Sequence, residues 1–173
     1  MRMVYTPMYR GLFAVMYSCG LRIGEAVALR PVDMDQHAMS ICVIGKGNKE
    51  RLVPLPQGLL DDLRLMWKTH GNKEWLFPNR AGSAPVAEDN VQRLFRTLRR
   101  ELGLSEDLTP HSLRHGFATR LFEQKMSAET IAILMGHDNV QTTKRYLHLT
   151  EAVCAQVKEA TASFYVPLFD QGR

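Results

Sequence analysis

A group of cationic side chains falls at the start of one predicted helix. In the stretch "LTPHSLRHGFATRLF", Thr109 and Pro110 are typical of a helix cap and first helical residue, and His111, Arg114 and His115 follow within the first turns. Their spacing of three and four residues predicts that they share one face of the helix. Cations are disfavoured at the positive end of a helix dipole, which favours an anion nearby. The alternatives are a solvated basic helix start and a hydrogen-bonded core histidine at position 115.

Four other polar side chains could join that anion site. Arg22 follows "CGL" at a predicted helix start, and its five guanidinium donors suit phosphate oxygens. Lys46 lies in "IGKGNKE", where small residues let a backbone turn approach a ligand and an ammonium arm reaches further. His137 follows Gly136, and Tyr146 comes nine residues after His137 in "TTKRYLHL". A solvated hairpin tip for Lys46, and a core or surface position for Tyr146, are the ordinary alternatives.

Taken together, these residue types fit phosphoryl-transfer chemistry. A tyrosine would be the nucleophile, two arginines would hold the non-bridging phosphate oxygens, and a lysine would protonate the leaving oxygen, with histidines assisting. The motifs contain no carboxylate pair to hold Mg²⁺, so the guanidinium pair would stabilise the developing charge in place of a metal. We expect no metal and no cofactor.

The pattern of apolar residues predicts a mainly α fold with a small antiparallel β-sheet (α+β). The sheet comes from "SICVIGKGNKERLVPLP", in which a β-branched run, a polar turn and a second short run form a β-hairpin. In the helix over "NVQRLFRTLRREL", the apolar stripe is expected to include Leu102. The other helices are predicted over residues 7–20, 21–30, 59–70, 110–124, 128–135, 142–149 and 151–163.

Length and composition limit the alternatives. A chain of 173 residues corresponds to about one domain, and 22 Lys and Arg against 18 Asp and Glu give a net charge of +4, which permits a polyanionic partner. Three cysteines outside any metal-binding spacing favour neither a disulfide framework nor a zinc site. The apolar run "GLFAVMYSCGL" is too short to cross a bilayer. We therefore expect a cytoplasmic protein with no membrane contact.

Four segments carry a specific resemblance. "CGLRIGEAVALR", "VIGKGNKERLVPLP", "LTPHSLRHGFATRL" and "LMGHDNVQTTKRYLHL" resemble, in order and spacing, the signature segments of the tyrosine recombinase (phage integrase) family, and its Xer-like members most. The resemblance implies a site-specific recombinase or integrase catalytic domain that cleaves and rejoins double-stranded DNA, without a metal, through a 3′-phosphotyrosyl intermediate.

The resemblance also implies a role for each matching residue. Tyr146 would attack the DNA phosphate, Arg22 and Arg114 would bind it, and Lys46 would be the general acid for the 5′-oxygen. Glu25 would support the site. The implied catalytic set is Arg22, Lys46, His111, Arg114, His137 and Tyr146, while His115 would lie behind these residues.

The same resemblance sets expectations for domains and assembly. Residues 1–173 would form a single catalytic domain, the helical core-binding domain that ordinarily precedes it would be absent, and a homo-tetramer would form on DNA from chains that can be monomeric when free. Residues 151–173 would pack either on a neighbouring protomer or on their own domain. The competing functions are a type IB topoisomerase-like strand cleavage and a DNA-binding module of the same fold with little turnover.

Overall fold

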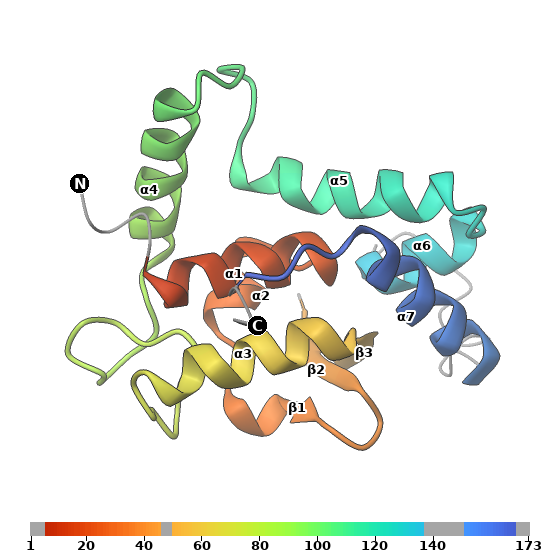
Figure 1. Ribbon diagram of the computed structural model, residues 1–173, viewed down its shortest axis with the longest axis horizontal. Helices are drawn as coiled ribbons and strands as arrows, with labels where there is room; N and C mark the ends of the chain where they lie inside the picture. Colours follow the sequence, from red (N-terminus) through yellow and green to blue (C-terminus); the bar gives the residue numbers. More distant parts are fainter. Residues whose placement is uncertain (1–5, 46–49, 137–150, 169–173) are drawn as a thin grey trace, which may run out of the picture.

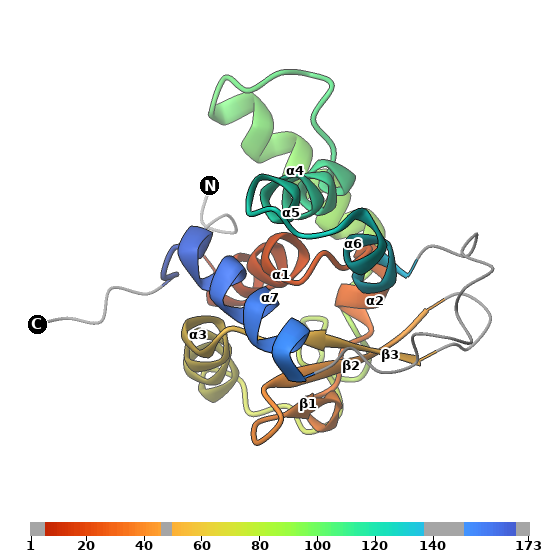
Figure 2. The ribbon, with the colours of Figure 1, turned by 90° about the vertical axis from the view of Figure 1, so that its right-hand side faces the viewer.

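Helix α1 runs through the middle of the molecule, with other elements packed on opposite sides of it. Figures 1 and 2 show α5 along one side of α1, and α3 with the β-sheet on the other. The structure, a computed structural model, describes residues 6–45, 50–136 and 151–168. The elements are α1 (Pro7–Ser18), α2 (Ile23–Val27), the 3₁₀ helix η2 (Pro31–Asp33), β1 (Met34–Asp35), β2 (Ser40–Ile44), β3 (Glu50–Pro54), α3 (Gln57–Lys68), α4 (Glu88–Glu101), α5 (Pro110–Glu123), α6 (Ala128–Met135) and α7 (Glu151–Phe164).

The predicted fold class is confirmed. β2 and β3 form the expected antiparallel hairpin, with Ser40 opposite Pro54 and Ile44 opposite Glu50. β1 adds a third strand, so that the sheet order is β1-β2-β3. A two-residue strand has too little alternation to be recognised in the sequence. The helix predicted over residues 142–149 lies outside the described residues.

Two hydrophobic clusters hold these elements together. The larger cluster gathers buried side chains of α1, α2, the sheet, α3 and α4, and includes Leu12, Ile41 and Leu63. The smaller one lies between α5, α6 and α7 and includes Phe117 and Leu134. Leu102 is 66% exposed because α4 ends at Glu101, so the prediction that it joins the buried stripe is wrong.

Helix α7 and the residues after it pack on the same chain. Val157 and Thr161 are buried against the smaller cluster. Beyond the helix, the Tyr165 hydroxyl donates to the buried carboxylate of Asp62 on α3, and the Leu168 N–H donates to the same oxygen at 2.6 Å. Up to Leu168 the tail therefore lies on its own domain, and residues 169–173 lie outside the described part. Among the helices of the described ranges, none is long and apolar enough to span a membrane.

Candidate functional site

Arg22 is placed by the turn between α1 and α2. The chain leaves α1 through Gly20 at φ +64°, and Arg22 is then the N-cap residue of α2. Two features require glycine at position 20. A left-handed backbone disfavours a side chain, and a Cβ there would lie 2.4 Å from the Phe117 ring. The turn leaves the Arg22 side chain 38% exposed. The prediction that Arg22 begins a helix after a glycine turn is confirmed.

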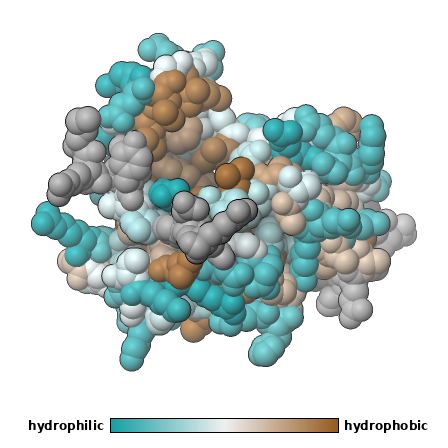
Figure 3. Space-filling view, viewed as in Figure 1, coloured by the Kyte–Doolittle hydropathy of each residue, from teal (hydrophilic) through white to brown (hydrophobic). Residues whose placement is uncertain are grey.

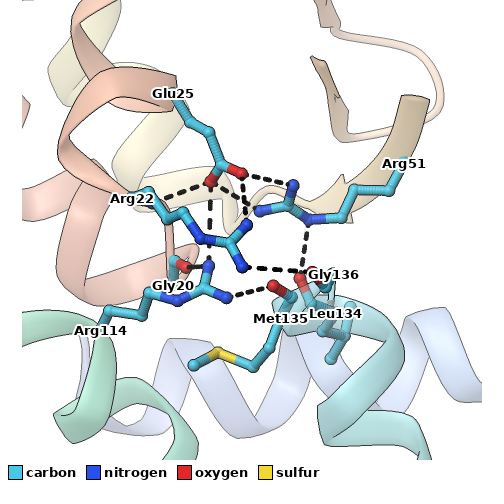
Figure 4. A network of polar contacts seen from close by, with 8 residues as sticks. All are labelled: Gly20, Arg22, Glu25, Arg51, Arg114, Leu134, Met135 and Gly136. Carbon is cyan, nitrogen blue, oxygen red and sulfur yellow. Dashed lines mark hydrogen bonds and ion pairs between the residues drawn. The ribbon is translucent and has the colours of Figure 1, made fainter. Parts of the chain in front are cut away.

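The carboxylate of Glu25 lies among three arginines, as Figure 4 shows. It accepts the backbone N–H of Arg22 at 2.8 Å and the Arg22 Nη1 at 3.0 Å. Arg51, from β3, donates Nη1 and Nη2 to the two carboxylate oxygens at 2.9 and 2.8 Å. Arg114 Nη1 lies 3.8 Å from the same carboxylate. Residues far apart in the chain thus meet at one acidic group.

Arg114 is the least exposed of the three guanidinium groups. It projects inward from the second turn of α5 and is 1% exposed. Its Nη1 donates to the Gly20 carbonyl at 2.5 Å, and its Nη2 donates to the Met135 carbonyl. Burial and the positive charge of Arg22 lower the pKa of Arg114 to about 10, so it remains a cation at neutral pH. Arg114 therefore joins α1 and α6 to α5 as well as carrying charge.

The end of α6 also converges on this cluster. Ser127 caps the helix start by accepting the Thr130 N–H, and Gly136 ends it in a left-handed conformation, as predicted. The last carbonyls of a helix lack partners within the helix and attract cations. Here they are satisfied by arginines: Leu134 accepts from Arg51 at 2.9 Å, Met135 from Arg114, and Gly136 from Arg22 at 3.3 Å.

The cluster carries a surplus of positive charge beside an open pocket. Burial raises the pKa of Glu25, but hydrogen bonds and charge from Arg51 and Arg22 outweigh that effect, so its pKa is lowered and it is ionised. One carboxylate cannot balance three guanidinium groups. Next to them is a pocket of about 530 Å³. It is lined by Arg22, His111, Arg114, His115, Ala118, Thr119, Phe122, Ala128, Ile131, Ala132 and Met135.

Both histidines of α5 lie on the exposed side of the helix. The rings of His111 and His115 are 4.7 Å apart, edge to face, and both line the pocket. His115 is exposed, which excludes the core-histidine alternative. Partial burial, the neighbouring His115 ring and the charges of Arg114 and Arg22 lower the pKa of His111, so a neutral imidazole is favoured at neutral pH. A neutral His111 can both donate and accept a hydrogen bond.

The structure brings together half of the predicted catalytic set and adds one residue. Arg22, His111 and Arg114 line one pocket. Lys46, His137 and Tyr146 lie outside the described residues. Arg51 was missed by the sequence reasoning, although alternation along β3 places it on the same face as buried Val53. Within the described ranges, no group of three His, Cys, Asp or Glu side chains could hold a metal ion.

A second hollow continues from His111 towards α4. It has a volume of about 370 Å³ and lies between α4 and the start of α5. Arg99 of α4 donates to the Leu108 carbonyl at 3.1 Å and so fixes the loop that leads into α5. Figure 3 shows a hydrophilic surface along one side of α4 with an apolar surface beside it. The lining residues with polar side chains are Gln92, Arg96, Arg99, Thr109 and His111.

Comparison with known sequences identifies the family. Residues 6–152 match the phage integrase family. A putative integrase/recombinase y4qK of Sinorhizobium fredii is 41% identical over 149 residues, which covers 85% of this chain and 48% of that protein. The tyrosine recombinase XerC of Xanthomonas axonopodis pv. citri is 37% identical over 153 residues, covering 87% and 50%. The chain spans about half the length of these curated relatives.

Solved structures agree with the sequence comparison. The integrase of mycobacterium phage Brujita superimposes with a TM-score of 0.75 at 21% identity, covering 95% of this chain and 55% of that one, and shares the fold. The XerH site-specific recombinase bound to a palindromic difH substrate, in a post-cleavage complex, gives a TM-score of 0.68 at 27% identity, covering 95% and 47%. The chain therefore belongs to the phage integrase family, and its fold is that of a tyrosine recombinase catalytic domain.

Proposed function

We propose that this chain is the catalytic part of a site-specific DNA recombinase that breaks and rejoins DNA by transesterification. The observation that carries the proposal is the convergence of Arg22 and Arg114, from two segments far apart in the chain, on one open pocket with surplus positive charge. Preorganised donors at a site of developing negative charge are usually the largest catalytic contribution. The recombinase names of the relatives support the same reaction class.

In the proposed reaction, the Tyr146 oxygen attacks a DNA phosphorus and the bond from phosphorus to the 5′-oxygen breaks. Arg22 and Arg114 stabilise the added charge on the non-bridging oxygens. Lys46 gives its proton to the departing 5′-oxygen, while His111 and His137 hydrogen-bond the phosphate or take up the proton that the Tyr146 hydroxyl loses. The phosphotyrosyl bond keeps the energy of the phosphodiester, so a second 5′-hydroxyl can reverse the step and rejoin the strand.

The surface next to the pocket supports DNA as the partner. Helix α4 projects from the body of the molecule in Figure 1, and its last turn carries Arg99 and Arg100. Arg96 lies in the hollow that leads to His111. Arginines bind phosphates along a duplex in a way that does not depend on sequence. Solved relatives include a XerH recombinase bound to difH DNA. The homo-tetramer on DNA, and a separate helical DNA-binding domain as its partner in a clamp, stay predictions.

The test is capture of the covalent intermediate on a suicide duplex nicked close to the scissile phosphate. We expect the parent chain to form an adduct that survives denaturation, and Tyr146→Phe to form none, because phenylalanine keeps the ring and lacks the nucleophilic oxygen. Circular dichroism and DNA binding of the variant should match the parent. An adduct of undiminished yield with Tyr146→Phe would remove Tyr146 from this role.

A further inference from the structure

We infer that Arg51 is a positioning residue that keeps Arg22 and Arg114 available for the phosphate by occupying both oxygens of Glu25. The inference rests on the proposed function, because it assigns a task to the neighbours of the two phosphate-binding arginines. Arg51 itself does not line the pocket. It acts through Glu25 and not on the substrate.

The first step of the argument is that Glu25 has no free acceptor position. A carboxylate has about four lone-pair sites. Two of these take the backbone N–H and the Nη1 of Arg22, and the other two take Nη1 and Nη2 of Arg51. Arg114 is left at 3.8 Å, which is an ion pair without a hydrogen bond. The carboxylate therefore holds Arg22 by only one side-chain bond.

The second step is what the carboxylate would do without Arg51. Glu25 is nearly buried, with 6% of its side chain exposed, so water cannot replace the lost donors at low cost. The other cations that pair with Glu25 are Arg22 and Arg114, the groups that the phosphate needs. An unsatisfied Glu25 would draw both guanidinium groups towards itself. Arg51 prevents this competition because its planar fork matches the carboxylate with two parallel bonds.

The third step is that Arg51 is itself fixed by its surroundings. Its Nε donates to the Leu134 carbonyl at 2.9 Å, and its side chain is 11% exposed. A Cβ at Gly136 would lie only 3.2 Å from Arg51 Cδ, so the absence of a side chain at the end of α6 makes room for the arginine. β3, α2 and α6 are thereby held in one arrangement around Glu25 (Figure 4).

This role predicts a pH dependence that a purely structural contact would not give. The charged groups that face Glu25 are Arg22, Arg51 and Arg114. Glu88 of α4 lies close to Gly24 of α2, and His111 lies near Arg22. Without Arg51, burial remains while the main group that lowers the pKa of Glu25 is lost, so this pKa rises. As the pH falls through the raised value, Glu25 becomes neutral and releases the two arginines.

The experiment is a double-mutant cycle on covalent adduct formation over a range of pH. Arg51→Met keeps the length of the side chain and should slow cleavage on the order of 10²-fold at neutral pH, the effect expected when reacting groups are misplaced. The ratio of the Arg51→Met rate to the parent rate should rise towards acidic pH. In the Glu25→Gln background, the same substitution should change the rate by no more than about threefold, independent of pH.

Two controls separate this inference from the proposed function. Arg64→Met removes a surface ion pair with Asp61 and should leave the rate unchanged. A carboxyl ¹³C NMR titration should show a higher Glu25 pKa in Arg51→Met than in the parent, whether or not the chain cleaves DNA. An unmoved Glu25 pKa, or a rate loss as large in the Glu25→Gln background, would overturn the role of Arg51. A parent chain without a Tyr146-dependent adduct would instead overturn the proposed function.

Discussion

The two arginines assigned to the phosphate differ in what else they hold. Arg22 is partly exposed and bonds Glu25 and the Gly136 carbonyl, whereas Arg114 is buried and satisfies the carbonyls of Gly20 and Met135. Activity and stability should therefore respond differently to the same substitution at the two positions.

We predict that Arg22→Ala and Arg114→Ala each lower the cleavage rate by about 10²–10³, the usual cost of one lost donor to developing charge. Arg114→Ala should also lower the free energy of unfolding by about 1–3 kcal/mol, because two buried carbonyls lose a donor. Arg22→Ala should lower it by less than Arg114→Ala does, because Arg22 is partly exposed and Glu25 keeps both of its bonds from Arg51. Single-turnover cleavage and urea unfolding measure the two effects. Equal destabilisation by both variants would contradict the prediction that Arg114 contributes more to stability than Arg22.

Lys46 gives a second prediction for a single side chain. If its ammonium protonates the leaving 5′-oxygen, Lys46→Ala should cleave a normal duplex poorly but cleave a 5′-bridging phosphorothiolate well, because a leaving sulfur needs no proton. Arg22→Ala is the control and should stay slow on both substrates. A Lys46→Ala variant that is equally slow on both would assign Lys46 to phosphate binding.

The sequence predicts most of the individual candidates but not their bonding. Pro110 and the spacing of His111 and Arg114 place these side chains at the start of a helix. Nothing local to Arg114 indicates that it turns inward, since its partners lie 94 and 21 residues away in the chain. Arg51 was overlooked because a basic residue beside a lysine-rich turn is usually solvated. Its place on the inward face of β3 was the available signal.

At the scale of the elements, the site depends on the turn that follows α1 and on how closely this turn packs against the Phe117 ring of α5. Gly20→Ala would force a side chain into a left-handed backbone at φ +64° and against Phe117. Strain of roughly 1–2 kcal/mol from the backbone and 1–3 kcal/mol from overpacking should add. Gly71→Ala is the matched control, because Gly71 has φ +61° but no atom within 4 Å of the added Cβ.

Thermal or urea unfolding of the two alanine variants checks this prediction. Gly71→Ala should show the backbone cost alone, and Gly20→Ala should be less stable than Gly71→Ala by the packing cost. Equal losses would mean that the Phe117 ring moves aside freely. The turn would then not fix the Gly20 carbonyl that Arg114 uses.

Element boundaries were predictable where local chemistry ends a helix. Pro7, Ser127 and Gly136 mark the expected ends in both sequence and structure. The short strand Met34–Asp35 was not predictable, because it is defined by pairing with Ile41 and Ser40 and not by its own residues. Long-range pairing of this kind leaves no local signal.

At the scale of the whole molecule, the arginines that line the two hollows and end α4 suit contacts with phosphates, which do not depend on base sequence. We expect a dissociation constant on the order of 10⁻⁴–10⁻⁶ M near physiological salt, the range of non-specific binding, with a steep salt dependence and little sequence preference. Fusion of a second DNA-binding domain should tighten binding by raising the effective concentration. Titration against matched and random duplexes at several salt concentrations is the measurement. Tight, sequence-selective and salt-insensitive binding would contradict this expectation.

The burial of Arg114 gives DNA binding a thermodynamic consequence. The same guanidinium bonds the turn after α1 and the end of α6, and it lines the pocket proposed for the phosphate. A ligand that binds only the native state adds its binding energy to folding, about 2.7 kcal/mol at a hundred times the dissociation constant. Because Arg114 also bonds the Gly20 and Met135 carbonyls, a ligand on Arg114 would favour the state in which these bonds are formed. With DNA bound, the protein should unfold at a higher temperature and be cleaved more slowly by proteases than without DNA. The unbound protein would then be the less stable form.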